Sequence, residues 1–387
     1  MLIKPIRSIL IILIVSACAT GPFYGSIRVG LLSLNRPLSL TVSISEGEYR
    51  MFLNGKDIPV SGNDNILVGL AGDKILVTVS NNTILADSLV LSTERNNSSF
   101  LIRNNLEIDI SRAYYGDLVI KADIQSLLAI NIIDIERYLA GVVQAEAGYK
   151  GNIEYFKTQS LLARTYLYMH LDRHTQDGYN LCDKTHCQAY HGISSVERIR
   201  EAINLTQGKV LVNADSLLVF TPFHSNCGGQ TESSENVWLT KIPHLASVTD
   251  PYCTYSPNAK WLVEIPVNEW INHLESHGYR HKNNDDLAFN QLSRKRYYTA
   301  GTFSYPLVNL RDELKLKSAF FSVSMVNDNI VLNGRGYGHG VGLCQEGARV
   351  MAKRGFKMRE IINFYFRDLL IIDIKDVKPA VEINSAF

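Results

Sequence analysis

The sequence lacks several features that would point directly to a function class. Its 387 residues carry a formal net charge of +1 and only 20% charged residues, so a large basic surface and a nucleic-acid partner are not expected. After the first 25 residues, no apolar run reaches the roughly 18 residues that cross a bilayer as a helix. No internal repeat or low-complexity tract is present. The chain is long enough to bury a substantial core and to form more than one domain.

The first 25 residues have the pattern of an export signal. Two basic residues precede a short apolar run, residues 9–15, and small residues precede Cys18. The order V-S-A-C resembles the lipobox of bacterial lipoproteins, which implies a signal peptide over 1–17, lipidation of the Cys18 thiol and a tether over 18–25. The alternative is an ordinary signal peptide with a chance cysteine. We expect a lipid-anchored protein of the cell envelope, outside the cytoplasmic membrane, and on the periplasmic face of the outer membrane if the cell has two membranes.

One carboxylate falls on the apolar face of a predicted helix. Apolar side chains fill the positions i, i+3, i+4, i+7 and i+8 of one helix face, namely Ile135, Tyr138, Leu139, Val142 and Val143. Glu146 takes the next position of that face, and Gly148 is suited to end the helix. Burial and the negative end of the helix dipole both disfavour an anion, so the pKa of Glu146 should be raised, as a general acid requires. The alternative is a glutamate at the solvent edge of the helix.

Five cysteines follow the signal region, and two of them lie close to a histidine. Cys182, His186 and Cys187 supply three potential ligands within six residues. Zinc takes Cys and His at such short range, and three protein ligands would leave a fourth position open. The alternative is a Cys182–Cys187 disulfide beside an exposed histidine. The other three cysteines are expected to give one disulfide and one unpaired thiol, namely Cys227–Cys253 and Cys344.

The residue pattern predicts an α+β fold. Short β-branched runs separated by Asn, Gly and Asp extend from about residue 26 to residue 134 and indicate an antiparallel β-rich region. Helices are then predicted at 135–147, 153–173, 196–205 and 356–369, with strands between them at 209–213 and 217–225. Residues 251–331 are polar and less regular, with strands expected at WLVEIPV and AFFSVSMV. The predicted helix over 153–173 is apolar nearly all round and should be buried, so Arg164 within it needs a partner.

A glycine-rich segment, GRGYGHGVGLCQEGA at 334–348, lies near the end of the chain. Its six glycines disfavour a regular strand or helix and permit close backbone approach to a ligand or another segment. His339 stands between two of these glycines and is expected at the surface of a cleft, the alternative being a turn that packs under the core. No Lys-Ser/Thr pair follows, so a phosphate-binding loop is not indicated.

Six motifs occur here in the order of the SpoIID/LytB family, which groups stage II sporulation protein D and amidase-enhancer proteins. They are YYGDLVIKA, NIIDIERYLAGVVQAE, KTQSLLARTYLY, LCDKTHCQAYHG, FHSNCGGQT and GRGYGHGVGLCQEGA. The resemblance covers about two thirds of the chain and implies a family domain over 114–375, a mixed α/β catalytic core with a glycan-binding cleft. The β-rich region then occupies 26–113, residues 251–331 form an insert, and 376–387 form a C-terminal tail.

The resemblance implies lytic transglycosylase action on peptidoglycan glycan strands, with Glu146 as the catalytic acid. It places Arg164, Gln188, Tyr190, His224, His339 and Gln345 in the glycan cleft. In sporulation members a zinc ion sits on a Cys-His-Cys cluster, which here maps to Cys182, His186 and Cys187, and a structural role is expected for it. The residues after Glu146 and Gln345 depart from the family pattern, so the wall of the site is expected to differ. The alternative function is a glycan-binding enhancer of a separate N-acetylmuramoyl-L-alanine amidase.

Overall fold

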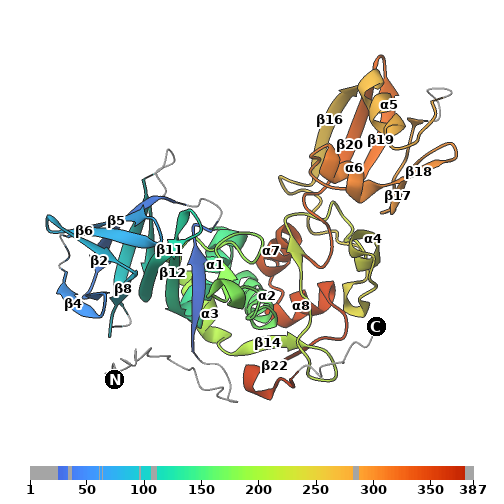
Figure 1. The fold of residues 1–387 in the computed structure, drawn as a ribbon. Coiled ribbons are helices and arrows are strands. Elements are labelled where there is room, and N and C mark those ends of the chain that lie inside the picture. Colours follow the sequence, from blue (N-terminus) through green and yellow to red (C-terminus); the bar gives the residue numbers. More distant parts are fainter. Residues whose placement is uncertain are drawn as a thin grey trace, which may run out of the picture.

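The computed structural model describes residues 25–33, 37–60, 62, 64–95, 97–105, 111–281 and 287–379 (Figure 1). The predicted signal peptide, the lipidation site Cys18, most of the tether and most of the C-terminal tail lie outside these residues. In the part of the chain that is described, no helix has the length and apolar character needed to cross a membrane.

Two antiparallel sheets build the N-terminal half and confirm the predicted β-rich region. The first has the strand order β13-β1-β12-β11-β8-β3-β4, and the second has the order β10-β9-β2-β5-β6-β7. The strands of the first are Leu181–Cys182, Ser26–Leu31, Ser126–Asp134, Asp117–Asp123, Ser88–Ser92, Arg50–Leu53 and Lys56–Pro59. Those of the second are Ser111–Tyr115, Ser99–Asn104, Ser39–Glu46, Asn65–Ala71, Lys74–Val79 and Asn82–Ala86. Buried residues alternate along β2, β6 and β8, and the two inner faces share one hydrophobic core.

The predicted boundary between 113 and 114 falls inside this β structure. Strand β10 spans it, and β11 and β12 belong to the first sheet although they carry motifs of the family domain. Only β13 joins β1 in parallel. Because β13 contains Cys182, the β region and the cysteine–histidine segment are parts of one continuous sheet.

A helical layer follows directly from β12. Helix α1 (Ile135–Ala147) begins at Asp134, whose side chain accepts from Arg137 N, and α2 (Ile153–Met169) begins at Asn152 in the same way. Helix α2 ends four residues earlier than predicted. The layer is completed by α3 (Glu197–Leu205), α7 (Gln345–Lys353), α8 (Met358–Tyr365) and the antiparallel pair β14 (Lys209–Val212) and β22 (Leu370–Asp373). The predicted strand at 217–225 is reduced to β15 (Phe223–His224), which pairs with β21 (Leu343–Cys344) beside α4 (Ser234–Trp238).

The segment expected to be less regular contains a folded unit with its own core, and the strands predicted at WLVEIPV and AFFSVSMV are present in it (Figure 1). Its elements are β16 (Lys260–Pro266), α5 (Val267–Glu275), β17 (Tyr297–Ala300), β18 (Phe303–Pro306), α6 (Leu307–Glu313), β19 (Phe321–Val326) and β20 (Asn329–Arg335). Each short element buries only one or two large side chains, such as Trp270 and Leu274 in α5. The sequence is therefore mostly polar even though Trp270, Tyr298 and Leu332 are fully buried together.

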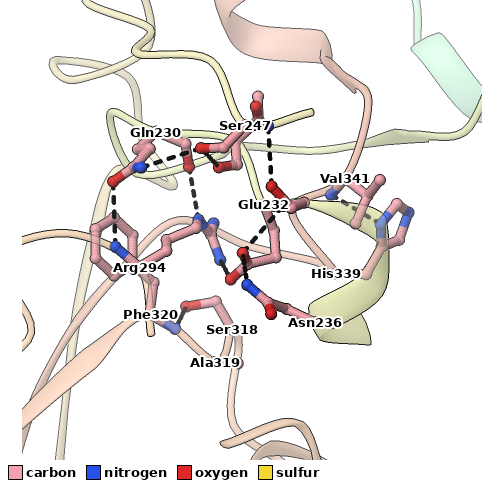
Figure 2. A network of polar contacts seen from close by, with 12 residues as sticks. Gln230, Glu232, Asn236, Ser247, Arg294, Ser318, Ala319, Phe320, His339 and Val341 are labelled. Carbon is pink, nitrogen blue, oxygen red and sulfur yellow. Dashed lines mark hydrogen bonds and ion pairs between the residues drawn. The ribbon is translucent and has the colours of Figure 1, made fainter. Parts of the chain in front are cut away.

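Arg294 links this unit to the rest of the protein (Figure 2). Its Nε donates to Gln230 O over 2.6 Å and its Nη2 donates to Cys227 O over 2.8 Å. Its Nη1 lies 3.7 Å from Glu232 Oε2. A Cβ at Gly340 would come within 2.7 Å of the Arg294 guanidinium, so the glycine-rich segment needs a glycine there. The unit is thus fixed to the segment that contains His339.

Candidate functional site

Glu146 lies in the last turn of α1, as the sequence predicted. The helix ends at Ala147, and Gly148 has a φ of 74° that favours glycine. The carboxyl is mostly buried, and its Oε1 accepts from Ala189 N over 2.6 Å. Burial raises the pKa of Glu146, and the Ala189 N–H opposes that rise. Glu146 has no salt bridge among the described residues. Its pKa is raised, which is the predicted direction.

Two side chains of α7 cover the end of α1. Gln345 Nε2 donates to the backbone oxygen of Glu146 over 3.1 Å, and Arg349 Nη2 donates to Ala147 O over 3.0 Å. The last carbonyl groups of a helix have no partner within the helix, so these donors satisfy them. Gln345 therefore lies beside Glu146, but it binds the backbone of Glu146 and not its carboxyl. Arg349, which binds the end of the same helix, was not predicted from the sequence.

The predicted metal ligands converge, and a fourth residue joins them. His186 Nδ1 lies 3.8 Å from Cys182 Sγ and 3.7 Å from Cys187 Sγ. His174, eight residues before Cys182, brings the group to four ligand atoms that all lie within 4.8 Å of one another. Its Nε2 is buried without a hydrogen-bond partner, and its Nδ1 lies 2.8 Å from Asp177 Oδ2.

This Cys₂His₂ group fits a zinc ion. Two sulfurs and two imidazole nitrogens are a tetrahedral donor set, and a carboxylate commonly holds the second nitrogen of a ligating histidine, as Asp177 does. The hydrogen bond between the two thiols lowers the pKa of Cys182 to about 4 and raises the pKa of Cys187, so one of the two sulfurs is favoured as a thiolate. The thiols of Cys182 and Cys187 are free, so the alternative disulfide is not formed. The sequence signal for His174 as a ligand is Asp177, a carboxylate three residues later that can hold the second ring nitrogen.

Arg164 does not take the predicted position in a cleft. Its side chain is fully buried, and its Nε donates to Glu136 Oε1 over 3.1 Å while Nη2 forms a second, shorter bond to Glu136 Oε2. The remaining donors reach Thr206, Lys209 and Ile203. The predicted need for a partner is met, but every donor group is engaged inside the protein and none is turned toward a substrate.

Gln188 and Tyr190 are also internal. Gln188 Nε2 donates to Ala163 O over 3.3 Å, and the Tyr190 hydroxyl donates to Asn131 Oδ1 over 3.2 Å. The Tyr190 ring packs 4.8 Å from that of Tyr138 on α1. Both side chains therefore support the loop that carries Ala189 instead of lining a surface.

His224 and His339 lie side by side, with ring centroids 5.5 Å apart. His224 is buried and its Nδ1 lies 3.1 Å from Val341 O, while its Nε2 has no partner. His339 is partly exposed, and its Nε2 lies 3.0 Å from Phe223 O. Burial lowers the pKa of both rings, that of His339 to about 4, so both are neutral at pH 7. His339 is closer to the predicted surface position than His224.

The predicted Cys227–Cys253 disulfide is not formed. Both thiols are free, with their Sγ atoms 3.3 Å apart instead of at the bonding distance of about 2.05 Å. Cys344, expected to be unpaired and separate, lies in the same cluster, as does Asp250. The sequence pattern could not show that four residues from distant segments share one space.

Comparison with known proteins finds relatives of this chain. Residues 123–213 match the family model SpoIID, described as Stage II sporulation protein. Stage II sporulation protein D of Bacillus subtilis is 28% identical over 261 residues, 62% of this chain and 74% of that protein. The amidase enhancer of Bacillus subtilis is 27% identical over 286 residues, 59% of this chain but only 39% of the enhancer.

A further relative spans nearly the whole molecule. An uncharacterised protein of Brachyspira hyodysenteriae is 25% identical over 364 residues, which cover 92% of this chain and 95% of that protein. The matched family segment holds Glu146, Arg164 and all four residues of the cysteine–histidine group. Residues 123–213 thus match a SpoIID domain, and the chain is similar to stage II sporulation protein D and to the amidase enhancer over about 60% of its length.

Proposed function

We propose that the protein acts on peptidoglycan as a lytic transglycosylase and that Glu146 is its general acid. The observation that carries this proposal is the carboxyl at the end of α1, whose pKa is raised by burial and which has no cationic partner among the described residues. Ala189 N donates a hydrogen bond to Oε1 of Glu146. Among the described residues no such donor binds Oε2, so Oε2 can carry the proton. A neutral carboxyl near pH 7 is what a general acid must supply.

The proposed reaction needs only one carboxyl. Glu146 donates its proton to the glycosidic oxygen between N-acetylmuramic acid and N-acetylglucosamine as the bond from C1 to that oxygen breaks. The C6 hydroxyl of the muramyl sugar attacks its own C1 and passes its proton back to the Glu146 carboxylate, which leaves a 1,6-anhydro end. Hydrolytic glycosidases use a second carboxylate beside the first. The pKa of Glu146 is raised by burial and not by a neighbouring carboxylate. This favours the one-carboxyl reaction.

The groups around Glu146 then have supporting roles. Gln345 and Arg349 hold the end of α1 and form one wall of the proposed cleft. His174, Cys182, His186 and Cys187 would hold a structural zinc ion. That ion would fix the loop that runs from Cys182 to Ala189, and Ala189 in turn positions the Glu146 carboxyl. The metal site thus supports the acid without touching the substrate.

The product distinguishes this reaction from hydrolysis. The full chain is incubated with peptide-stripped glycan strands in water enriched in oxygen-18, and the new ends are analysed by mass spectrometry. We expect 1,6-anhydro-muramyl ends without the heavy isotope, because the attacking oxygen belongs to the sugar. Reducing ends that contain oxygen-18, or intact strands, would contradict the proposal.

The similarity to the amidase enhancer supports a second candidate function, a non-catalytic protein that binds glycan and stimulates an N-acetylmuramoyl-L-alanine amidase. The same cleft would then present strands to the amidase. The two functions separate when amidase activity is measured with the native chain and with Glu146→Gln. Equal stimulation by both proteins, with no anhydro ends from either, would favour the enhancer.

The lipid anchor at Cys18 is part of the proposal, since it would place the protein at a membrane facing the cell wall. Cys18→Ser should leave the protein uncut or release it in soluble form. Membrane fractionation of the native chain and the variant checks this, and an unchanged distribution would contradict the anchor.

A further inference from the structure

Three cysteines and one aspartate meet in the core at a distance from Glu146 along the chain. Cys227 follows β15, Asp250 and Cys253 lie in one loop, and Cys344 ends β21. All four residues are fully buried, and their ligand atoms all lie within 4.8 Å of one another. Cys227 Sγ is 3.3 Å from Cys253 Sγ and 3.2 Å from Asp250 Oδ2. The group is thus as compact as a metal-binding site.

From this arrangement we infer that Cys227, Asp250, Cys253 and Cys344 form a second metal site, which takes a thiophilic divalent cation such as zinc. Three sulfurs and one carboxylate oxygen complete a tetrahedral donor set of the kind that zinc accepts. The set leaves no open position, so the site is structural. It shares no residue with the cysteine–histidine group.

The Asp250 carboxyl favours a cation over a simple disulfide. A disulfide would use two of the three sulfurs and leave the third thiol facing a buried carboxyl. Asp250 is fully buried and has no salt bridge among the described residues. A buried carboxylate without a cation is costly, whereas a divalent ion between the four groups would compensate its charge.

Neighbouring donors hold the four ligands in place, as they do in protein metal sites. Cys344 Sγ accepts from Cys227 N over 3.3 Å and from Gly347 N over 3.4 Å. Asp250 Oδ2 accepts from the Tyr365 hydroxyl over 2.9 Å. A Cβ at Gly347 would come within 2.4 Å of Asp250 Oδ2, so this glycine allows α7 to approach the cluster.

Charge is balanced from one further side. Three thiolates and a carboxylate around a divalent ion carry two excess negative charges. The buried guanidinium of Arg294 lies beside the cluster, where Nη2 donates to Cys227 O over 2.8 Å. Since Arg294 belongs to the folded insert, the metal site would also be where the insert contacts the segment of Cys227.

The metal would fix the start of α7. The Cys344 side chain caps this helix by accepting from Gly347 N, and Gln345 follows directly. Gln345 and Arg349 of α7 bind the carbonyl oxygens at the end of α1. The ion would therefore tie the segments of Cys227 and Cys253 to the helix that covers the Glu146 end of α1.

Metal counting on the full chain tests the inference. The protein is purified without chelator or added reductant, extracted in detergent if it is membrane-bound, and analysed by elemental mass spectrometry. We expect about two zinc ions per chain, one for each site. The double variant C182S/C187S should keep about one zinc ion, at the site of Cys344. The variant C344S should lose the zinc ion from that site and keep the one at the cysteine–histidine site. Cobalt reconstitution of C182S/C187S should then give an intense thiolate-to-metal absorption.

Asp250→Asn guards against a variant that merely fails to fold, because it keeps the size of the side chain and its amide oxygen can still accept from the Tyr365 hydroxyl in place of Oδ2. It should lower metal affinity at this site by at least about 10-fold while the other site stays filled. Asp215→Asn, an exposed change of the same kind, should alter neither site. One zinc per native chain together with a Cys227–Cys253 disulfide in the peptide map would overturn the inference. Loss of all metal from C182S/C187S would overturn it as well.

Discussion

The two glutamates of α1 lie at opposite ends of one helix and have opposite surroundings. Glu136, in the first turn, accepts two hydrogen bonds from the guanidinium of Arg164. Glu146, in the last turn, also has an arginine nearby, but Arg349 binds the carbonyl oxygen of Ala147 and not the carboxyl. The helix dipole favours an anion at the Glu136 end and disfavours one at the Glu146 end. One carboxyl is therefore paired with a buried guanidinium, and the other has no cationic partner among the described residues.

The difference shows that the partner, more than the residue type, decides what a half-buried carboxyl does. Both side chains belong to the same helix and both are mostly shielded from solvent. Arg164 and Arg349 come from different helices, α2 and α7, and only the first points at a carboxyl. Substitutions at the two ends should therefore affect different properties, stability at one and catalysis at the other.

The largest effect on stability is expected from Glu136→Gln. The change leaves the fully buried Arg164 guanidinium without a counter-charge. In comparable buried pairs such a loss lowers the free energy of unfolding by about 3–5 kcal/mol. The lower end of this range applies because Glu136 is partly exposed. Urea unfolding measures the loss. Glu201→Gln, an exposed change on α3, should stay within about 0.5 kcal/mol of the native chain. Equal losses for both variants would remove the distinction between the two ends.

Weakening the cysteine–histidine site should affect only the Glu146 end. Asp177→Asn removes the carboxylate that holds His174 Nδ1, and loss of such a partner lowers metal affinity by about 10–100-fold. Competition with a zinc chelator measures this change. Asp172→Asn, exposed on the same turn, should leave the affinity unchanged. If both variants bind zinc like the native chain, the assignment of His174 as a ligand is wrong.

Arg349→Met should lower stability by about 1–2 kcal/mol. It removes the charged donor to Ala147 O at the negative end of the helix but keeps most of the contact with the Tyr155 ring. Thermal unfolding gives the change. Arg354→Met is the control, since that arginine also lies over a tyrosine ring, that of Tyr252, but not at the end of α1. A larger loss in the control would contradict the role given to Arg349.

The smallest effect on stability, and one of opposite sign, is expected from Glu146→Gln. The pKa of Glu146 is raised in the folded protein, so the native chain loses stability as the pH rises through that pKa, and the loss is absent below the pKa of the unfolded chain. The variant lacks this ionisation. It should equal the native chain in acid and exceed its stability above the raised pKa, as measured by unfolding at a series of pH values. A variant less stable than the native chain at neutral pH would show that the carboxylate is favourably bound.

The sequence was informative where the relevant contacts are local. The spacing from Ile135 to Glu146, followed by Gly148, was enough to place the acid at the end of a helix and to predict the direction of its pKa shift. Cys182, His186 and Cys187 lie within six residues, so their convergence required no knowledge of the fold. The antiparallel strands were likewise visible from alternation and turn residues.

Long-range contacts could not be read in this way. The partner of Arg164 lies 28 residues away, and Cys227 and Cys344 are separated by 117 residues. The sequence showed that a buried arginine needs a carboxylate, but many carboxylates are available in the chain. Arg164 and Tyr190 belong to family motifs, so they were expected in a cleft, but both are buried inside the protein. The insert was expected but its own hydrophobic core was not, because a small core needs few apolar residues from each short element.

The central claim is that the Glu146 carboxyl, and not the one at the other end of α1, transfers the proton. It is tested by comparing the cleavage of peptide-stripped glycan by Glu146→Gln and Glu136→Gln at a temperature where both are folded. Glu146→Gln should lose at least about 10²–10⁴-fold in rate while its glycan binding and metal content stay unchanged. Glu136→Gln should keep native activity per folded molecule, and that activity should fall as the pH rises through the raised pKa of Glu146. Formation of anhydro ends by Glu146→Gln at the native rate would contradict the account.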